Sequence, residues 1–175
     1  NQASGFGAST VGGGILNQGT LTVTSSTISG NTADSGGALY QGNAEASAVL
    51  SNVTIAGNAT PESVQLRSLS GASISLVSSI VANPVSGGNC EVFFGGTITS
   101  NGHNLDSGNS CHFAAAGDLI NADPVLGPLQ NNGGPTATMA LLAGSKAIDK
   151  GANPLALATD QRGTGFAPSS GRVRI

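Results

Sequence analysis

The stretch Thr27–Thr32 reads TISGNT, and Thr54–Ala59 repeats it as TIAGNA. A weaker third copy, Ser79–Pro84, reads SIVANP. The isoleucine of each copy steps by 27 and then 25 residues along the chain, and so does the asparagine. A period of this length is typical of solenoids, in which each repeat buries its apolar side chains against its neighbours.

Short alternating runs between these copies indicate strands rather than helices. Thr20–Thr24, Ala48–Ile55 and Ala72–Leu76 are rich in β-branched residues, and in the first run leucine and valine alternate with threonine. Alternation of this kind places the apolar side chains on one face of a strand. Gly and Asn punctuate each run, as turns with positive φ require. The sequence therefore predicts an all-β fold, a right-handed parallel β-helix, with its coils in residues 1–122.

One asparagine ends each copy of the repeat. Equivalent corners of stacked coils lie above one another, so Asn31, Asn58 and Asn83 are expected to form a hydrogen-bonded ladder. The alternative is that these side chains contact a glycan or another ligand. We favour the ladder, because it satisfies backbone groups that the corners leave unpaired.

Residues 123–175 break the pattern and predict an irregular cap packed on the end of the helix, within the same structural domain. The stretch contains Pro124, Pro128 and Pro135, which cannot donate to a strand ladder, so the chain should wrap rather than stack. The apolar run Met139–Leu142 is expected to cover the open end of the last coil.

Few polar residues are candidates for a site. Asp149, Asp160 and Arg162 are expected to form a network of ion pairs and turns within the cap, with a metal site or a catalytic group as the alternatives. His103 and His112, the only histidines, lie in loops near acidic and cysteine residues. A histidine in such a loop is more often simply exposed, so we predict no metal site, no catalytic residue and no cofactor.

The two cysteines, Cys90 and Cys111, lack the spacing of a redox or zinc motif and flank a Gly/Asn-rich stretch. Closing that loop as a disulfide would stabilise the fold by roughly 3 kcal/mol and would imply an oxidising compartment. The alternative is a pair of buried thiols.

These motifs together resemble the choice-of-anchor Q domain family of bacterial secreted and surface β-helix proteins. The cysteine pair encloses Gly102, Asn104 and Leu105, and residues 123–163 contain DPVLGPL, NGGPTAT, LLAGSKAID and DQRG in that order. The coil motifs GGGILN and STISGNTA are also similar to the repeats of polymorphic outer-membrane adhesins. The resemblance implies an extracellular or cell-surface β-helix. The chain departs from the family at Met139, where members carry His, and at Arg174, where members end in acidic residues that lead to an anchor.

Composition narrows the function classes. The net charge is −3 and Lys and Arg total 6, without a basic run, so nucleic acid is not an expected partner. No apolar stretch reaches the length of a transmembrane helix, and residues 1–5 lack the features of a signal peptide. The expected partner is a surface ligand, either a glycan or a protein. Because a solenoid end exposes strand edges, we also predict self-association through the N-terminal coil.

Two other functions are known for parallel β-helices. Polysaccharide hydrolases and lyases need converging carboxylates, whereas the nine acidic residues of this chain are scattered. Ice binding needs flat threonine rows that recur from coil to coil. At the 27-residue offset, Thr22 falls opposite Val49 and Thr24 opposite Ser51, so the row begun by Thr20 is not expected to persist. The preferred prediction is therefore a non-catalytic, adhesin-like or structural module.

Overall fold

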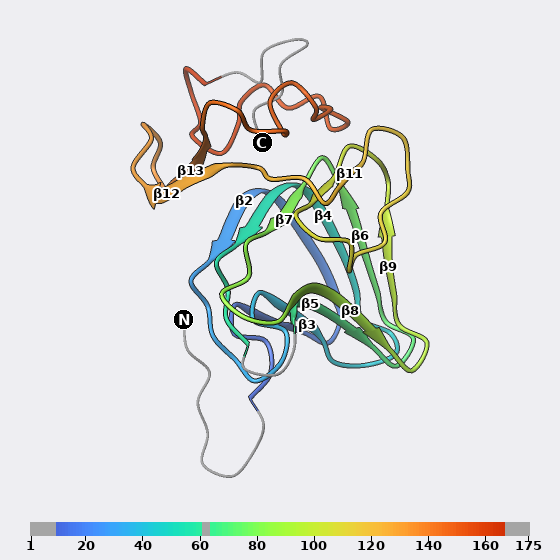
Figure 1. The fold of residues 1–175 in the computed structure, drawn as a ribbon. Coiled ribbons are helices and arrows are strands. Elements are labelled where there is room, and N and C mark those ends of the chain that lie inside the picture. The colour runs from blue at the N-terminus through green and yellow to red at the C-terminus, as the bar shows by residue number, and fades with distance from the viewer. Residues whose placement is uncertain (1–9, 61–63, 167–175) are drawn as a thin grey trace.

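The computed structural model describes residues 10–60 and 64–166, and these residues form strands and turns with no helix among them. Figure 1 shows the strands enclosing a core. The strands are β1 (Ile15–Asn17), β2 (Thr20–Ser29), β3 (Leu39–Gln41), β4 (Ser47–Ala56), β5 (Val64–Leu69), β6 (Ser73–Val77), β7 (Ile80–Ala82), β8 (Gly88–Phe93), β9 (Thr97–Ser100), β10 (Leu105–Asp106), β11 (Leu119–Ile120), β12 (Leu126–Gln130) and β13 (Thr138–Leu141).

Parallel strands stack on three sides of the molecule. The A side consists of β1, β3, β5 and β8. The B side consists of the first halves of β2 and β4 with β6 and β9, and the C side of their second halves with β7, β10 and β11. The chain is thus a parallel β-solenoid of about three turns, which confirms the predicted fold class.

Inward-facing side chains form columns that run through the stacked coils. Leu39 pairs with Leu66 on the A side, and Leu50 pairs with Leu76 on the B side. All four are fully buried, at 0% exposure. Burial of each such side chain contributes about 1.5–3 kcal/mol, so these columns are the main stabilising element of the fold.

In the third coil, the observed pairing of the repeats differs by one residue from the predicted alignment. Ile28 pairs with Ile55 as expected, but the next member of that inward column is Val81. Ile80 pairs with Thr54 instead and faces outward. A shift of one residue moves every side chain of a strand to its other face, so the pairing of Ile80 with Ile28 and Ile55 was wrong.

Ile80 is fully buried although it faces outward, because the C-terminal segment covers the C side. Ile80, Ala82 and Leu105 form a second apolar cluster with Ala147, and Leu126 packs against it. Figure 1 shows β12, β13 and the red C-terminal segment lying over the side that carries β2, β4 and β7. The predicted cap on the helix end is therefore wrong in its placement: residues 123–166 form a lateral strap.

The strap follows a corner of the coils. The B side meets the C side at Ser25, Asn52, Ser78 and His103, one residue from each coil, and all four have positive φ, between 44° and 58°. Strap contacts run along this corner from the last coil back to the first: Lys150 O with His103 Nδ1, Ala152 N with Ser78 Oγ, Ala152 O with Asn52 Nδ2, and Gln161 Oε1 with Thr27 Oγ1. The strap thereby joins coils that do not touch one another.

Removing residues 123–175 should leave a chain that aggregates or loses cooperative melting, because the truncation exposes Ile80 and Leu105 on an open sheet face. Thr27 and Thr54 occupy the same outward column in the first two coils. The truncated chain with Ile80→Thr and Leu105→Thr should therefore regain solubility. Light scattering and thermal melting measure both effects, and a soluble, cooperatively melting truncation without these substitutions would contradict the strap.

The C-terminal end of the core is closed by the loop between β10 and β11. Cys90 of β8 forms a disulfide with Cys111 of this loop, with 4.8 Å between their Cα atoms, so the predicted disulfide is confirmed. Phe113, two residues further on, is only 4% exposed and packs into the main core. The loop between β10 and β11 thus closes the helix end, a role that the sequence had assigned to Met139–Leu142.

The start of the first coil is tied down by Asp34, whose carboxylate accepts hydrogen bonds from Thr10 N at 2.7 Å and Thr10 Oγ1 at 2.9 Å. The backbone bond and then the hydroxyl bond hold the pKa of Asp34 below its ordinary value of 3.8. A lowered pKa means that this tie stabilises the fold above the unfolded-state pKa and is lost as the pH falls through the folded-state pKa. An NMR titration should show Asp34 titrating below 3.8, with the Thr10 amide losing its exchange protection in the same range. The Asp34→Asn variant should show no such step.

Candidate functional site

A continuous chain of buried polar side chains lines the corner between the C and A sides. Asn31 Nδ2 donates to Asn58 Oδ1 at 3.0 Å, and Asn58 Nδ2 donates to Gln65 Oε1 at 2.9 Å. Gln65 Nε2 then donates to Asn89 Oδ1 at 2.8 Å, and Asn89 Nδ2 donates to Asp106. All five residues are at most 7% exposed. Since each member satisfies its neighbours inside the solenoid, the chain has a structural role.

Asn83, the third predicted member of the ladder, lies elsewhere. Its backbone oxygen accepts from Gly57 N, its side chain is exposed, and its φ of 48° matches the positive φ of Gly30 and Gly57. Asn83 therefore occupies the corner position of those glycines, one residue before the ladder position. Pro84 stands at the ladder position and has no side-chain amide, so Gln65 and Asn89 continue the chain of hydrogen bonds.

The predicted network in the C-terminal segment centres on one ion pair. Arg162 Nη2 lies 2.6 Å from Asp160 Oδ2, and Arg162 Nε also donates to this carboxylate. The Arg162 guanidinium lies 4.1 Å from the ring centroid of Phe166, in cation–π geometry. Asp149 lies in a different, exposed turn, with a φ of 60°. Asp160 and Arg162 fix the fold of the strap where it reaches the first coil.

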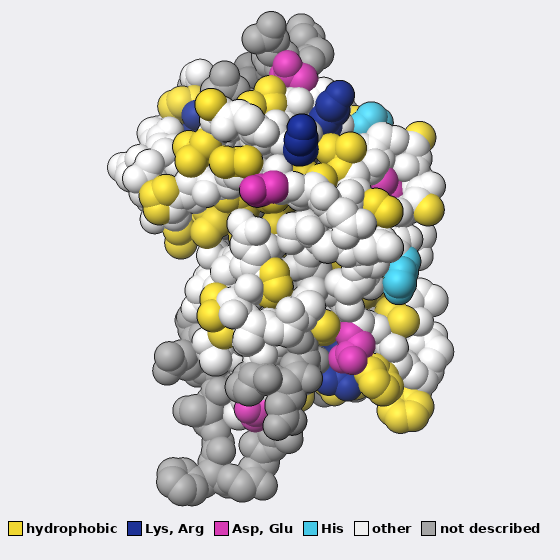
Figure 2. Space-filling model, in the orientation of Figure 1, with side chains coloured by type: hydrophobic (Ala, Val, Ile, Leu, Met, Phe, Trp, Pro, Cys, Tyr) yellow, Lys and Arg dark blue, Asp and Glu magenta, His cyan; other side chains and the backbone are white. Residues whose placement is uncertain are grey.

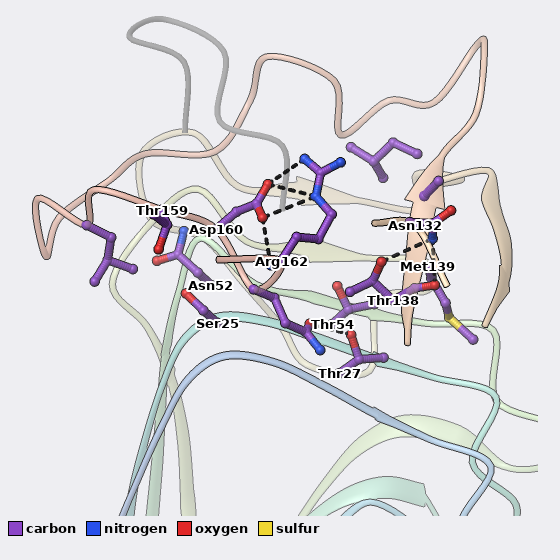
Figure 3. Close-up of a pocket in the computed structure, with 14 residues that line it drawn as sticks. Ser25, Thr27, Asn52, Thr54, Asn132, Thr138, Met139, Thr159, Asp160 and Arg162 are labelled. Atoms are coloured by element: carbon purple, nitrogen blue, oxygen red, sulfur yellow. Dashed lines mark hydrogen bonds and ion pairs between the residues drawn. The ribbon is translucent and has the colours of Figure 1, made fainter. Parts of the chain in front are cut away.

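A pocket of about 90 Å³ lies between the strap and the C side (Figure 3). Its coil wall carries Ser25, Thr27, Asn52 and Thr54, and its strap wall carries Thr138, Met139, Leu141, Leu157, Thr159 and Asp160 among others. Asn52 Oδ1 is buried without a hydrogen-bond partner among the described residues. The pocket can hold several water molecules or one small neutral polar group. The single carboxylate in its lining, Asp160, is held by Arg162, whereas glycoside hydrolysis uses two.

The two histidines occupy separate loops. His103 Nδ1 lies 2.8 Å from the carbonyl oxygen of Lys150, which can only accept, so this nitrogen carries a proton. His112 is exposed in the loop between β10 and β11, next to Cys111. Asp106 lies inside the core, where it accepts hydrogen bonds from the backbone of Gly108 and Cys111. Among the residues that the structure describes, no group of three or more His, Cys, Asp or Glu side chains is placed to hold a metal ion.

The outward side chains of the B side form two uncharged rows in register. The first row runs across four strands through Thr20, Ser47, Ser73 and Thr97. The second row runs through Thr22, Val49, Ser75 and Thr99. The predicted pairings of Thr22 with Val49 and of Thr24 with Ser51 are confirmed. The last two coils, which the sequence comparison of the first two could not cover, continue the first row with hydroxyl side chains and restore them to the second row after Val49.

An exposed aromatic corner lies at the end of β8. Phe93 and Phe94 are 40% and 84% exposed, and their ring centroids lie 5.7 Å apart. The Arg67 guanidinium lies 4.8 Å from the Phe93 ring centroid, and Arg67 Nε lies 3.3 Å from Glu91. Phe94 has a φ of 49°, which a bulky side chain rarely adopts. Sequence patterns did not indicate this corner, although the FFGG stretch that forms it is visible in the chain.

Charged side chains elsewhere on the surface are sparse, as the face shown in Figure 2 illustrates. No helix among the described residues is both long enough and apolar enough to cross a membrane. Comparison with family models, with curated proteins and with solved structures finds no match to the chain. The resemblance to the choice-of-anchor Q family therefore stays a prediction that rests on the motifs themselves.

Proposed function

We propose that this chain is a non-catalytic β-helix module that acts outside the cell and attaches to glycans on another surface. The observation that carries the proposal is the aromatic corner of Phe93 and Phe94. An exposed aromatic pair beside an arginine is the composition found where binding energy concentrates in an interface. The flat rings can pack against the apolar face of a sugar ring, and Arg67 and Glu91 can bond to its hydroxyl groups.

The backbone of Phe94 supports the same proposal. Leu69 pairs with Phe93, so Ser70 occupies the same corner in the preceding coil, and its φ of 54° is close to the 49° of Phe94. The corner therefore forms equally well with a small polar residue. Gly95, the next residue, also has positive φ and would suit the turn without any aromatic group. The sequence thus keeps a water-exposed phenylalanine where the fold itself does not need one.

The Cys90–Cys111 disulfide is compatible with secretion, because disulfides persist in oxidising compartments. The polysaccharide-active enzyme is the competing function, and the scattered carboxylates do not favour it. The predicted self-association through the N-terminal coil would bury Ile15, Leu21 and Val23. These side chains pack against the core but are only partly buried within the described part of the chain. The test of this self-association is the mass of the protein in concentrated solution.

The proposal is tested by incubating the full chain with immobilised plant, algal and bacterial polysaccharides. Depletion of the protein measures binding, and mass spectrometry of the supernatant searches for released sugars. We expect retention on at least one polysaccharide and no products. Products from any of them would overturn the non-catalytic proposal, and failure to bind any would overturn the glycan ligand.

The variant Phe94→Gly tests whether the polysaccharide binds at the aromatic corner. This variant should bind about tenfold or more weakly, because the loss of an aromatic anchor costs at least about 1.4 kcal/mol of binding free energy. That energy corresponds to a tenfold change in the dissociation constant. The variant should keep or gain thermal stability, because glycine adopts positive φ without strain. The matched control is Val85→Ser, which removes another exposed apolar side chain, one that is 70% exposed. Equal binding by both variants would contradict a role for the corner.

A further inference from the structure

We propose that the outer face of the B side binds ice. This face uses none of the residues of the aromatic corner and adds a second activity to the proposed function. The proposal rests on the two rows described above, which place hydroxyl and methyl groups on a regular two-dimensional grid.

The grid follows from the parallel register. Thr20, Ser47, Ser73 and Thr97 pair in sequence without a bulge, so the first row crosses the four strands in line. Strands in a sheet lie about 4.8 Å apart, and alternate residues of a parallel strand lie about 6.6 Å apart. Spacings of this size are comparable to the repeats of hexagonal ice along its principal axes. Water molecules held by one hydroxyl are therefore placed near lattice positions relative to those held by the next.

The chemistry of the rows suits neutral, ordered water. Seven of the eight side chains in the two rows are Ser or Thr, and the exception is Val49, 42% exposed. Valine has nearly the shape of threonine and lacks only the hydroxyl, so the second row keeps its outline at this position. Thr20, Thr22, Thr97 and Thr99, which flank the array on its two outer strands, are all exposed.

Other occupants fit the rows less well. Nucleic acids and acidic polymers need clustered cations, and the two rows carry no charge. Protein interfaces concentrate aromatic residues and arginine, and neither type occurs in the rows. A sugar polymer would favour an aromatic platform, which this protein carries at the Phe93–Phe94 corner instead. An in-register grid of small hydroxyl and methyl groups remains well matched to a crystalline water surface.

The test uses the full, disulfide-bonded chain in a freezing-point osmometer and in a growing ice hemisphere. We expect the wild-type protein to show thermal hysteresis and to be taken up into the ice. Thr22→Tyr and Thr99→Tyr each place a large ring on the exposed rows without touching the core, and each should abolish both effects. Thr164→Tyr makes the same change at an exposed threonine in the strap, and should behave as wild type.

Val49→Thr should raise the hysteresis, because it completes the second row with a hydroxyl. An inactive wild-type protein, or activity unchanged by Thr22→Tyr and Thr99→Tyr, would overturn the proposal. Either result would leave polysaccharide binding and its loss in Phe94→Gly untouched, so the failure of this inference is distinguishable from a failure of the proposed function.

Discussion

Replacing Asn58 with leucine is expected to lower the free energy of unfolding by about 2–6 kcal/mol, because at least two buried polar groups lose their partners at about 1–3 kcal/mol each. The Asn58 amide bonds to Asn31, to Gln65 and to the backbone oxygen of Ile28, and the residue has no exposed surface. Leucine has a similar volume, so the change removes hydrogen bonds without opening a large cavity. Chemical denaturation under oxidising conditions measures the loss.

Asn83→Gly is the matched control for this substitution. The repeat motif assigns Asn83 the same role as Asn58, but the structure places it exposed at positive φ. Glycine adopts that conformation readily, so we expect unchanged or slightly higher stability. Similar losses in both variants would show that the register of the third coil is the one the sequence suggested.

The second large effect is expected from the disulfide. The double variant Cys90→Ala and Cys111→Ala should lose about 3 kcal/mol, the value for closing a loop of about 20 residues in the unfolded chain. The lost bond also releases the loop that carries Phe113, which closes the C-terminal end of the core. Thermal melting of the variant should therefore begin at a lower temperature than that of the wild-type protein.

Reduction of the wild-type protein provides the control, because it changes no residue. Cys90 and Cys111 are 5% and 4% exposed, so reductant should act slowly on the folded protein and quickly once denaturant opens it. A wild-type protein reduced under denaturing conditions and refolded should melt like the double variant. Equal melting of the oxidised and reduced forms would contradict a stabilising role for this bond.

The fold class could be predicted because its signals are local. Gly30 and Asn31 recur as Gly57 and Asn58, and the runs between them alternate as strands do. Such patterns repeat within each coil and need no knowledge of distant residues. The pairings of the first two coils followed from the same period and are confirmed.

The third coil could not be aligned correctly, because one of its apolar side chains packs against the distant C-terminal segment rather than in the core. Ile80 can be apolar although it faces outward, because Leu126 and Ala147 cover it. No residue within the coil indicates that such a cover exists. The prolines of the C-terminal segment excluded a further stacked coil but could not specify whether the chain would pack on the end or the side. The disulfide could be predicted from the two cysteines alone. The burial of Phe113 could not, because it depends on how all the coils stack.

The candidate sites were the least predictable part. The pocket joins residues as far apart as Ser25 and Arg162, which come together only through the strap. The coils differ in length from one turn to the next. A fixed offset in the sequence could therefore predict which residues share a row of the B side only for the first two coils. The aromatic corner stands out only once Phe94 is known to be exposed.

The strap has a mechanical consequence. In a solenoid whose repeats contact only their neighbours, coils can peel away from either end one at a time. The strap instead connects the corner of the last coil, at His103, to the first coil, at Thr27. Tension applied along the stack is therefore shared by every layer, and extension should occur in one abrupt rupture rather than as a staircase of small steps. A module tied in this way keeps its outer faces intact while it is pulled.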